Sequence, residues 1–170
     1  PFTYVFSDPS YAGGRGERMF VNAIGAAGRF EPSQVDERLF GADVALFGAT
    51  AIVPPLHRAL GSLLRRVRER GGITVVSTVF DFLNEQADPE GRWPLGESDE
   101  TFGLIDLLVT DREEALRTSG TASVAEAVRF FREMGTGTVV VTQGAEPFWL
   151  WSRGTLFGAR DVGTLPVCDA

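Results

Sequence analysis

Acidic, hydroxyl-bearing and glycine residues follow four short apolar runs of the sequence. These segments are Gly48-Ala49-Thr50, Phe80-Asp81, Thr110-Asp111 with Glu113-Glu114, and Thr142-Gln143-Gly144-Ala145. Carboxylates can hold a divalent cation or its waters, and glycine lets backbone N–H groups approach a phosphate. The combination predicts a binding edge for a magnesium nucleotide.

Each of these residues also has a purely structural interpretation. Asp111 and Glu114 have the spacing of a helix N-cap and the third helical residue, where carboxylates satisfy free N–H groups and the helix dipole. Spacing alone favours this role for the pair. Asp81 would likewise cap the segment that follows it, and Thr142 to Gly144 would form only a turn.

The apolar runs predict buried strands of a mostly parallel sheet. They are Asp43–Phe47, Ile73–Val79, Leu104–Val109 and Thr138–Thr142. Their hydrophobicity is continuous, which is typical of strands buried on both faces. Helical patterns lie between them: one helix from Pro54 through Val67, a short one after Thr110, and one from Ser123, with a capping box to Glu126, to Met134. This order predicts an α/β fold whose ligands bind at the carboxyl ends of the strands.

Both ends of the chain predict antiparallel hairpins. Near the start, Thr3–Ser7 and Glu17–Ile24 are strand-like and are separated by the glycine-rich segment 12–16. Near the end, Phe148–Trp151 and Thr155–Phe157 are expected to pair through Arg153-Gly154, with Trp149 and Trp151 packing on one face.

Composition excludes several classes of function. The chain carries 16 basic and 23 acidic residues, a net charge of -7, which argues against binding nucleic acid. The sequence predicts neither a membrane span nor a signal peptide. A lone cysteine and a lone histidine, His57, cannot supply a usual zinc site, and a structural or surface role is expected for that histidine. The chain has no lysine and therefore no Walker-type phosphate loop.

The ordered set of motifs resembles the ribokinase/PfkB family of carbohydrate kinases. Gly16-Glu17-Arg18 with Gly25-Ala26 is similar to the family's lid strand, 42–48 to the strand that leads to the sugar pocket, and 75–81 to a strand that ends in Asp. Asp106 to Ala115 resembles the Asn-x-x-Glu motif, and Val139 to Ala145 the nucleotide-phosphate strand and turn. Pro166 to Ala170 is similar to the run before the Gly-Ala-Gly-Asp signature. The resemblance therefore implies that the chain is a fragment that lacks the family's N-terminal sugar-binding segment and whose catalytic Asp would lie beyond Ala170.

The resemblance implies site residues one by one. Glu114 would organise Mg²⁺ through water, and Asp111 would stand at the family's Asn position. Thr142, Gly144 and Ala145 would contact the nucleotide phosphates, although Pro147 replaces a glycine that is common there. Asp81 and Arg92 would lie toward the substrate and phosphate, without the family's Asp-x-Asn-x-x-Arg spacing. Asp169 matches a position that in some members helps bind a monovalent cation, which makes K⁺ a candidate cofactor beside ATP and Mg²⁺.

The implied protein is a cytoplasmic, ATP-dependent sugar kinase with a ribokinase-like three-layer α/β/α sandwich and a small β-lid. Residues 1–27 would belong to the lid, which would also form a homodimer interface, and residues 28–170 to the central part of the nucleotide- and sugar-binding domain. The small-molecule substrate would be phosphorylated on a hydroxymethyl group, and the isolated chain is expected to be inactive. The alternatives are a nucleoside kinase of the same fold and a non-catalytic sugar- or nucleotide-binding protein.

Overall fold

The computed structural model describes residues 2–14 and 17–167. The strands are β1 (Phe2–Asp8), β2 (Glu17–Ala23), β3 (Val44–Gly48), β4 (Ile73–Ser77), β5 (Leu107–Asp111), β6 (Thr138–Gln143), β7 (Glu146–Ser152) and β8 (Arg160–Leu165). The α-helices are α1 (Tyr11–Gly14), α2 (Pro54–Arg58), α3 (Leu60–Glu69), α4 (Phe82–Ala87), α5 (Arg112–Ser119) and α6 (Val124–Glu133). Short 3-10 helices are η1 (Gly25–Arg29), η2 (Pro32–Gln34), η3 (Glu37–Gly41), η4 (Thr50–Ile52) and η5 (Asp99–Leu104).

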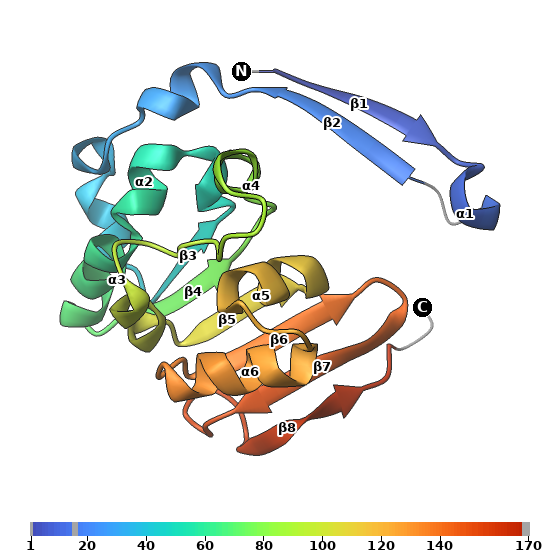
Figure 1. Cartoon of the computed structure of the whole chain (residues 1–170). Coiled ribbons are helices and arrows are strands. Elements are labelled where there is room, and N and C mark those ends of the chain that lie inside the picture. Colours follow the sequence, from blue (N-terminus) through green and yellow to red (C-terminus); the bar gives the residue numbers. More distant parts are fainter. Residues whose placement is uncertain (1, 15–16, 168–170) are drawn as a thin grey trace.

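The body is built on a six-stranded sheet in the order β3-β4-β5-β6-β7-β8 (Figure 1). The first four strands are parallel, β7 pairs antiparallel with β6, and β8 pairs antiparallel with β7. The four predicted strands therefore form and pair as expected, and the α/β class is confirmed. The carboxyl ends of β3 to β6 bring the segments that follow them to one edge of the sheet.

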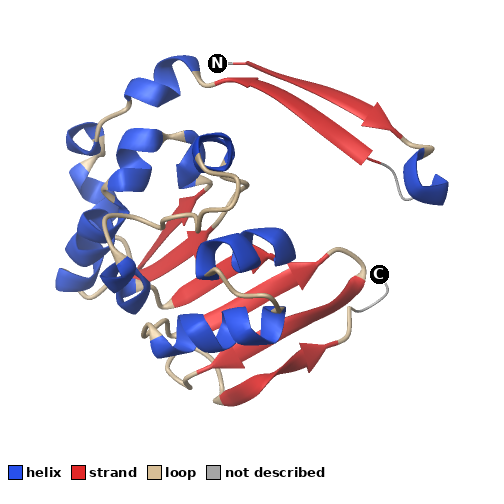
Figure 2. Cartoon of the chain, viewed as in Figure 1, coloured by secondary structure: helices blue, strands red, loops and turns tan. Residues whose placement is uncertain are grey.

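The hydrophobic core lies between one face of this sheet and helices α3, α5 and α6. Figure 2 shows α5 and α6 lying over the same face of the strands. In register across that face are Phe47, Val76, Leu108, Val139 and Trp151. Trp149 packs against the same core, so the prediction that the two tryptophans share a face is confirmed.

On the opposite face of the sheet, the described edge strand β3 is exposed, whereas the outward residues of the neighbouring strand β4 are half-buried. Val44 and Leu46 of β3 are 54% and 61% exposed, and the burial of β3 alternates along the strand. The prediction that these strands are buried on both faces is therefore wrong for β3, because only Ala45 and Phe47 of this strand face the core.

The helix predicted from Pro54 through Val67 is divided into α2 and α3 at Ala59, whose backbone leaves the helical range at φ -108° and ψ 12°. The break exposes the first amide groups of α3, and a distant carboxylate satisfies them. Glu97 accepts hydrogen bonds from the backbone N–H of Gly61 at 2.6 Å and of Ser62 at 2.9 Å. Burial opposes ionisation of Glu97, but hydrogen bonds from the Ser62 side chain and from these amides hold its pKa below the ordinary value.

Helix α6 forms where the sequence predicts it. Ser123 is the N-cap, and its hydroxyl accepts from the Glu126 backbone N–H at 3.3 Å. In a standard capping box the Glu126 carboxylate would accept from the Ser123 backbone N–H. Here the carboxylate accepts instead from the Ser123 hydroxyl, at 2.8 Å. The apolar stripe of α6 supplies Val124, Ala127, Val128 and Phe131 to the core.

The predicted pairing of Thr155–Phe157 with β7 is wrong. After β7 the chain turns at Gly154, whose φ of +98° suits glycine, and the Ser152 hydroxyl accepts from the Gly154 N–H at 3.2 Å. The chain then passes through an irregular loop, and β8 (Arg160–Leu165) supplies the strand that pairs with β7. Val162 of β8 packs against the core, which explains why this later segment takes the edge position.

The N-terminal hairpin is confirmed: β1 and β2 pair antiparallel from Phe2 opposite Ala23 to Asp8 opposite Glu17. Residues 12–14 of the predicted connection belong to the short α1, and residues 15–16 lie outside the described part. Figure 1 shows the hairpin as an arm that projects from the body. In the described part of the chain, no helix is long and apolar enough to cross a membrane.

Candidate functional site

The candidate site begins where β5 ends and α5 begins. Asp111 is the N-cap of α5: its Oδ1 accepts from the backbone N–H of Glu114 at 2.8 Å, and the Asp111 N–H donates to Glu114 Oε2 at 3.4 Å. This capping box is the structural role that the spacing favours. It also fixes two carboxylates side by side at the carboxyl edge of the sheet, so the capping role and a metal-binding role are compatible.

Glu114 is the more buried of the two acids. Its residue is 8% exposed, and its Oε2 accepts a hydrogen bond from the hydroxyl of Thr78, which follows β4. The Thr78 hydroxyl also lies 2.8 Å from that of Thr110 on β5. Burial raises the pKa of the Glu114 carboxyl, the bond from Thr78 opposes the rise, and the charge of Asp111 adds to it.

The turn between β6 and β7 lies beside this pair of carboxylates. Asp111 and Thr142 are direct neighbours in the parallel pairing of β5 with β6. Gly144 has a φ of +63°, a conformation that favours glycine, and the turn bends the chain back into β7. Asp111, Arg112, Thr142 and Gly144 line one open cavity of about 460 Å³. Ala145, the third expected phosphate contact, belongs to the same turn.

The charges around this cavity select the kind of ligand it can hold. Glu113 and Glu146 line it together with Asp111, and Arg112 supplies positive charge. The three carboxylates would repel a bare polyphosphate. A divalent cation bound between them would neutralise the negative charge of the carboxylates and of the phosphates. Mg²⁺ is usually held through one or two carboxylates, several waters and the phosphates of its substrate. Asp111 lines the cavity and Glu114 is bonded to it, so the pair supplies the one or two carboxylates that this pattern needs. Among the described residues there is no cluster of three or more metal-binding side chains.

Asp81 lies apart from this cavity. It is 4% exposed and is the N-cap of α4, with its carboxylate accepting from the backbone N–H of Asn84 at 3.1 Å and from its amide at 2.6 Å. The carboxylate also lies 3.6 Å from Nε2 of His57. That histidine is 7% exposed, so the structural role expected for it fits its position, whereas a surface position does not.

Arg92 lies on the surface of the loop that follows α4. It forms an ion pair with Asp99, and its guanidinium lies 5.3 Å from the ring centre of Phe130 on α6. The structure therefore brings Asp111, Thr142 and Gly144 to one cavity, and Glu114 lies behind Asp111, bonded to it but outside the cavity lining. Asp81 and Arg92 are engaged elsewhere. Asp169, the expected cation ligand, lies outside the described residues.

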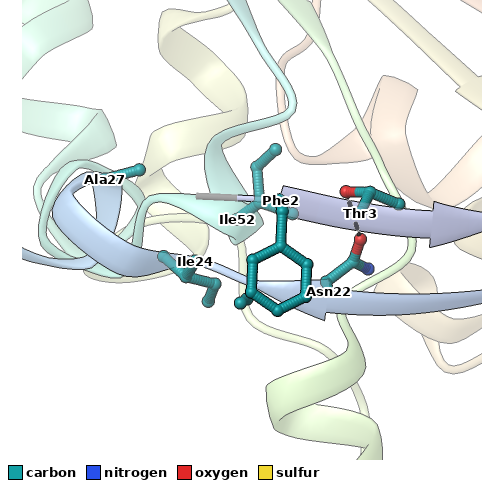
Figure 3. Close-up of a pocket in the computed structure, with 7 residues that line it drawn as sticks. Phe2, Thr3, Asn22, Ile24, Ala27 and Ile52 are labelled. Atoms are coloured by element: carbon teal, nitrogen blue, oxygen red, sulfur yellow. Dashed lines mark hydrogen bonds between the residues drawn. The ribbon is translucent and has the colours of Figure 1, made fainter.

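A second cavity, which the sequence did not predict, lies at the base of the hairpin (Figure 3). It measures about 240 Å³ and is lined by Phe2, Thr3, Asn22, Ala23, Ile24, Ala27 and Ile52. Its lining is mostly apolar, and the Thr3 hydroxyl donates to the Asn22 side-chain oxygen at 2.8 Å. Ile52 comes from η4, directly after the carboxyl end of β3. No local motif marks this cavity, because it forms between three segments that are distant in the sequence: residues 2–3, 22–27 and 52.

Solved structures with the same fold are carbohydrate kinases by description. A fructokinase of Xylella fastidiosa with bound ATP is 16% identical at a TM-score of 0.65, with 99% of this chain and 50% of that chain covered. A ribokinase of Arabidopsis thaliana with ribose and ATP is 15% identical at 0.63, with 92% and 46% covered. An E. coli protein assigned as ribokinase II, with ATP and Mg²⁺, is 16% identical at 0.65, with 91% and 48% covered. The chain thus spans about half the length of these structures, and at such identities the likeness shows a ribokinase-like fold alone.

The sequence itself places the chain in a family. The sequence pattern of the pfkB family of carbohydrate kinases matches residues 11–167, which is most of the chain. No curated protein matches the chain significantly. The chain belongs to the pfkB family of carbohydrate kinases.

Proposed function

We propose that this chain carries the nucleotide edge and the lid of an ATP-dependent carbohydrate kinase, which transfers the γ-phosphoryl group to a sugar hydroxymethyl group. The observation that carries the proposal is the adjacency of the Asp111–Glu114 pair and the Thr142–Gly144 turn at the ends of two neighbouring parallel strands. Membership of the pfkB family and the ATP bound in solved structures of the same fold support it.

Each residue of the nucleotide edge, that is Asp111, Glu114, Thr142 and Gly144, would have its own role. Mg²⁺, when bound with ATP, neutralises phosphate charge. Glu114 would hold waters of the ion, and Asp111 would fix the Glu114 backbone while adding a second negative charge. Thr142 would offer a hydroxyl to a phosphate oxygen, and the left-handed backbone at Gly144 would leave the turn's N–H groups open to phosphate. Catalysis would rest on positioning and charge neutralisation.

The hairpin cavity is the proposed site of the acceptor. It lies at the same carboxyl edge as the nucleotide cavity, over the end of β3 instead of β5 and β6. Its apolar walls suit the C–H face of a sugar ring, and the Thr3–Asn22 pair offers hydrogen-bonding groups to a hydroxyl. Measuring the binding of a panel of sugars and nucleosides to the same protein would distinguish a sugar kinase from a nucleoside kinase.

The hairpin is also the proposed homodimer contact. Tyr4 pairs with Val21 and Phe6 with Met19, so these four side chains share one face of the ribbon. Their exposures are 62%, 47%, 55% and 60% respectively. An isolated two-stranded ribbon is marginally stable in water, so this apolar face calls for a partner surface. Sedimentation over a dilution series should give dimers that dissociate, and Tyr4→Asp should give monomers throughout; a monomer at all concentrations of the unaltered chain would refute the contact.

The nucleotide proposal is tested by titrating the chain with ATP in the presence and absence of Mg²⁺. We expect binding only with Mg²⁺, and we expect Glu114→Gln to weaken it about tenfold or more, since it removes a carboxylate from the ion's surroundings. Glu69→Gln, an equivalent change at the exposed end of α3, serves as the matched control and should bind as the unaltered chain does. Equal affinity with and without Mg²⁺, or an unchanged Glu114→Gln variant, would contradict the assignment.

A further inference from the structure

His57 occupies a buried polar position that the proposed reaction does not use. It lies on the short helix α2, is 7% exposed, and contacts three other segments of the chain. Its Nδ1 lies 2.9 Å from the Thr50 hydroxyl, its Nε2 lies 3.0 Å from the Pro94 carbonyl oxygen, and the same Nε2 lies 3.6 Å from the Asp81 carboxylate. Thr50 follows β3, Asp81 follows β4, and Pro94 belongs to the loop after α4.

The partners determine the hydrogen-bond directions. A carbonyl oxygen only accepts, so Nε2 of His57 carries a proton and donates to Pro94. In the neutral imidazole Nδ1 is then an acceptor, and the Thr50 hydroxyl donates to it. Thr50 is itself 7% exposed, so loss of the imidazole leaves its hydroxyl buried without this partner.

The contact with Thr50 supports a strained turn. The residue before it, Ala49, has a φ of +53°, a left-handed conformation that disfavours residues with a Cβ. Such a conformation persists only where its surroundings hold it in place. The Ala49 N–H donates to the Ser77 carbonyl at 2.9 Å on one side, and His57 holds Thr50 on the other. Two residues further on, Ile52 forms part of the wall of the hairpin cavity.

We propose that His57 is a positioning residue. In its Nε2-protonated form it accepts the hydrogen bond from the Thr50 hydroxyl and thereby keeps Ala49 in its left-handed conformation. It so determines the position of η4, and with it the position of Ile52 in the wall of the hairpin cavity. The inference rests on the proposed function only in that the ligand of the hairpin cavity, which Ile52 lines, is taken to be the phosphoryl acceptor. It assigns the sole histidine of the chain to the geometry of the acceptor side of the site.

The test uses hydrogen exchange on the whole chain without any ligand. The reporters are the amides of Ile52 and Val53, which donate within the turn to Ala49 and Thr50 at 3.2 and 2.8 Å. His57→Gln keeps a donor able to reach Pro94 and removes the Nδ1 acceptor. We expect these two amides to exchange about five- to tenfold faster, while the amide of Leu108 in the central sheet is unchanged.

Two further variants separate positioning from simple packing. Adding Ala49→Gly to His57→Gln should restore most of the lost protection, because glycine adopts the left-handed turn without the anchor. Thr50→Val should reproduce the effect of His57→Gln, and Thr50→Ser, which retains the hydroxyl, should not. These Thr50 variants give the same answer if His57→Gln fails to fold.

A long-range ¹⁵N spectrum of the sole histidine gives an independent readout, with the Nε2-protonated tautomer expected. The Nδ1-protonated tautomer, equal acceleration of the turn and the sheet core, or no rescue by Ala49→Gly would each overturn the inference. Because none of these measurements involves nucleotide, Mg²⁺-dependent ATP binding by the same variants reports separately on the proposed function.

Discussion

The bond between Thr78 and Glu114 yields the most direct energetic prediction. Thr78→Val keeps the shape of the side chain and removes the hydroxyl that donates to the buried Glu114 carboxylate. A hydrogen bond to a charged group contributes about 1.5–3 kcal/mol, and a neutral one about 0.5–1.5 kcal/mol. Near pH 8, above the ordinary range of carboxyl groups, we therefore expect Thr78→Val to lower the free energy of unfolding by about 1.5–3 kcal/mol.

The assay is urea denaturation of a double-mutant cycle with Glu114→Gln. Removing the charge should remove part of the penalty of Thr78→Val, giving a coupling of about 1 kcal/mol. Thr78→Ser, which retains the donor, is the control and should cost far less than the valine variant. If the effects of Thr78→Val and Glu114→Gln add to within about 0.5 kcal/mol, the two side chains do not interact as described and the reasoning is refuted.

Three further predictions follow from the same contacts. Burial raises the pKa of Glu114 above its ordinary 4.5, so the contribution of this group to stability is present below pH 4.5 and is lost as the pH rises through its folded-state pKa. The Tm of the Glu114→Gln variant should therefore decline less with rising pH than the Tm of the unaltered chain. Equal declines of the two Tm values would contradict this prediction. Glu97 has a lowered pKa, so its stabilisation is present above 4.5 and is lost as the pH falls through the folded-state value; Glu97→Gln should cost about 1 kcal/mol in urea denaturation near neutral pH and nothing in acid. Phe131 is fully buried, and Phe131→Ala should cost about 3–5 kcal/mol, whereas a loss under 1 kcal/mol would argue against the described core.

Local patterns predicted those features that depend on neighbouring residues. The four apolar runs became neighbouring parallel strands, Ser123 capped its helix, and the spacing of Asp111 and Glu114 gave a capping box. In each case the predictive pattern lies within one strand or one helical turn, where side-chain periodicity and capping chemistry act directly.

Features that depend on distant partners escaped prediction. The break at Ala59 is accompanied by capping from Glu97, 36 residues beyond Gly61, and periodicity around the break continues undisturbed. The pairing of β8 was missed because the apolar segment 155–157 resembles a strand better than the glycine-containing segment 160–165 does. Continuous hydrophobicity could not reveal that Leu46 lies on an open face, since exposure depends on which segments cover the sheet.

The candidate site divides in the same way. Asp111, Thr142 and Gly144 were identified from their positions after strands, and Glu114 from its spacing to Asp111, because the topology of a parallel sheet gathers such residues at one edge. Asp81 satisfies the same rule and yet turns inward to Asn84 and His57, since backbone position does not determine where a side chain points.

The central claim is that Mg²⁺-ATP binds where the carboxyl ends of β5 and β6 meet. Backbone amide chemical shifts of the chain, recorded during titration with ATP at saturating Mg²⁺, measure this directly. We expect the largest shifts at Glu114, Thr142 and Gly144, little change at Thr3 and Asn22, and loss of the pattern when Mg²⁺ is chelated. Shifts centred on the hairpin, or a pattern that persists without Mg²⁺, would contradict it.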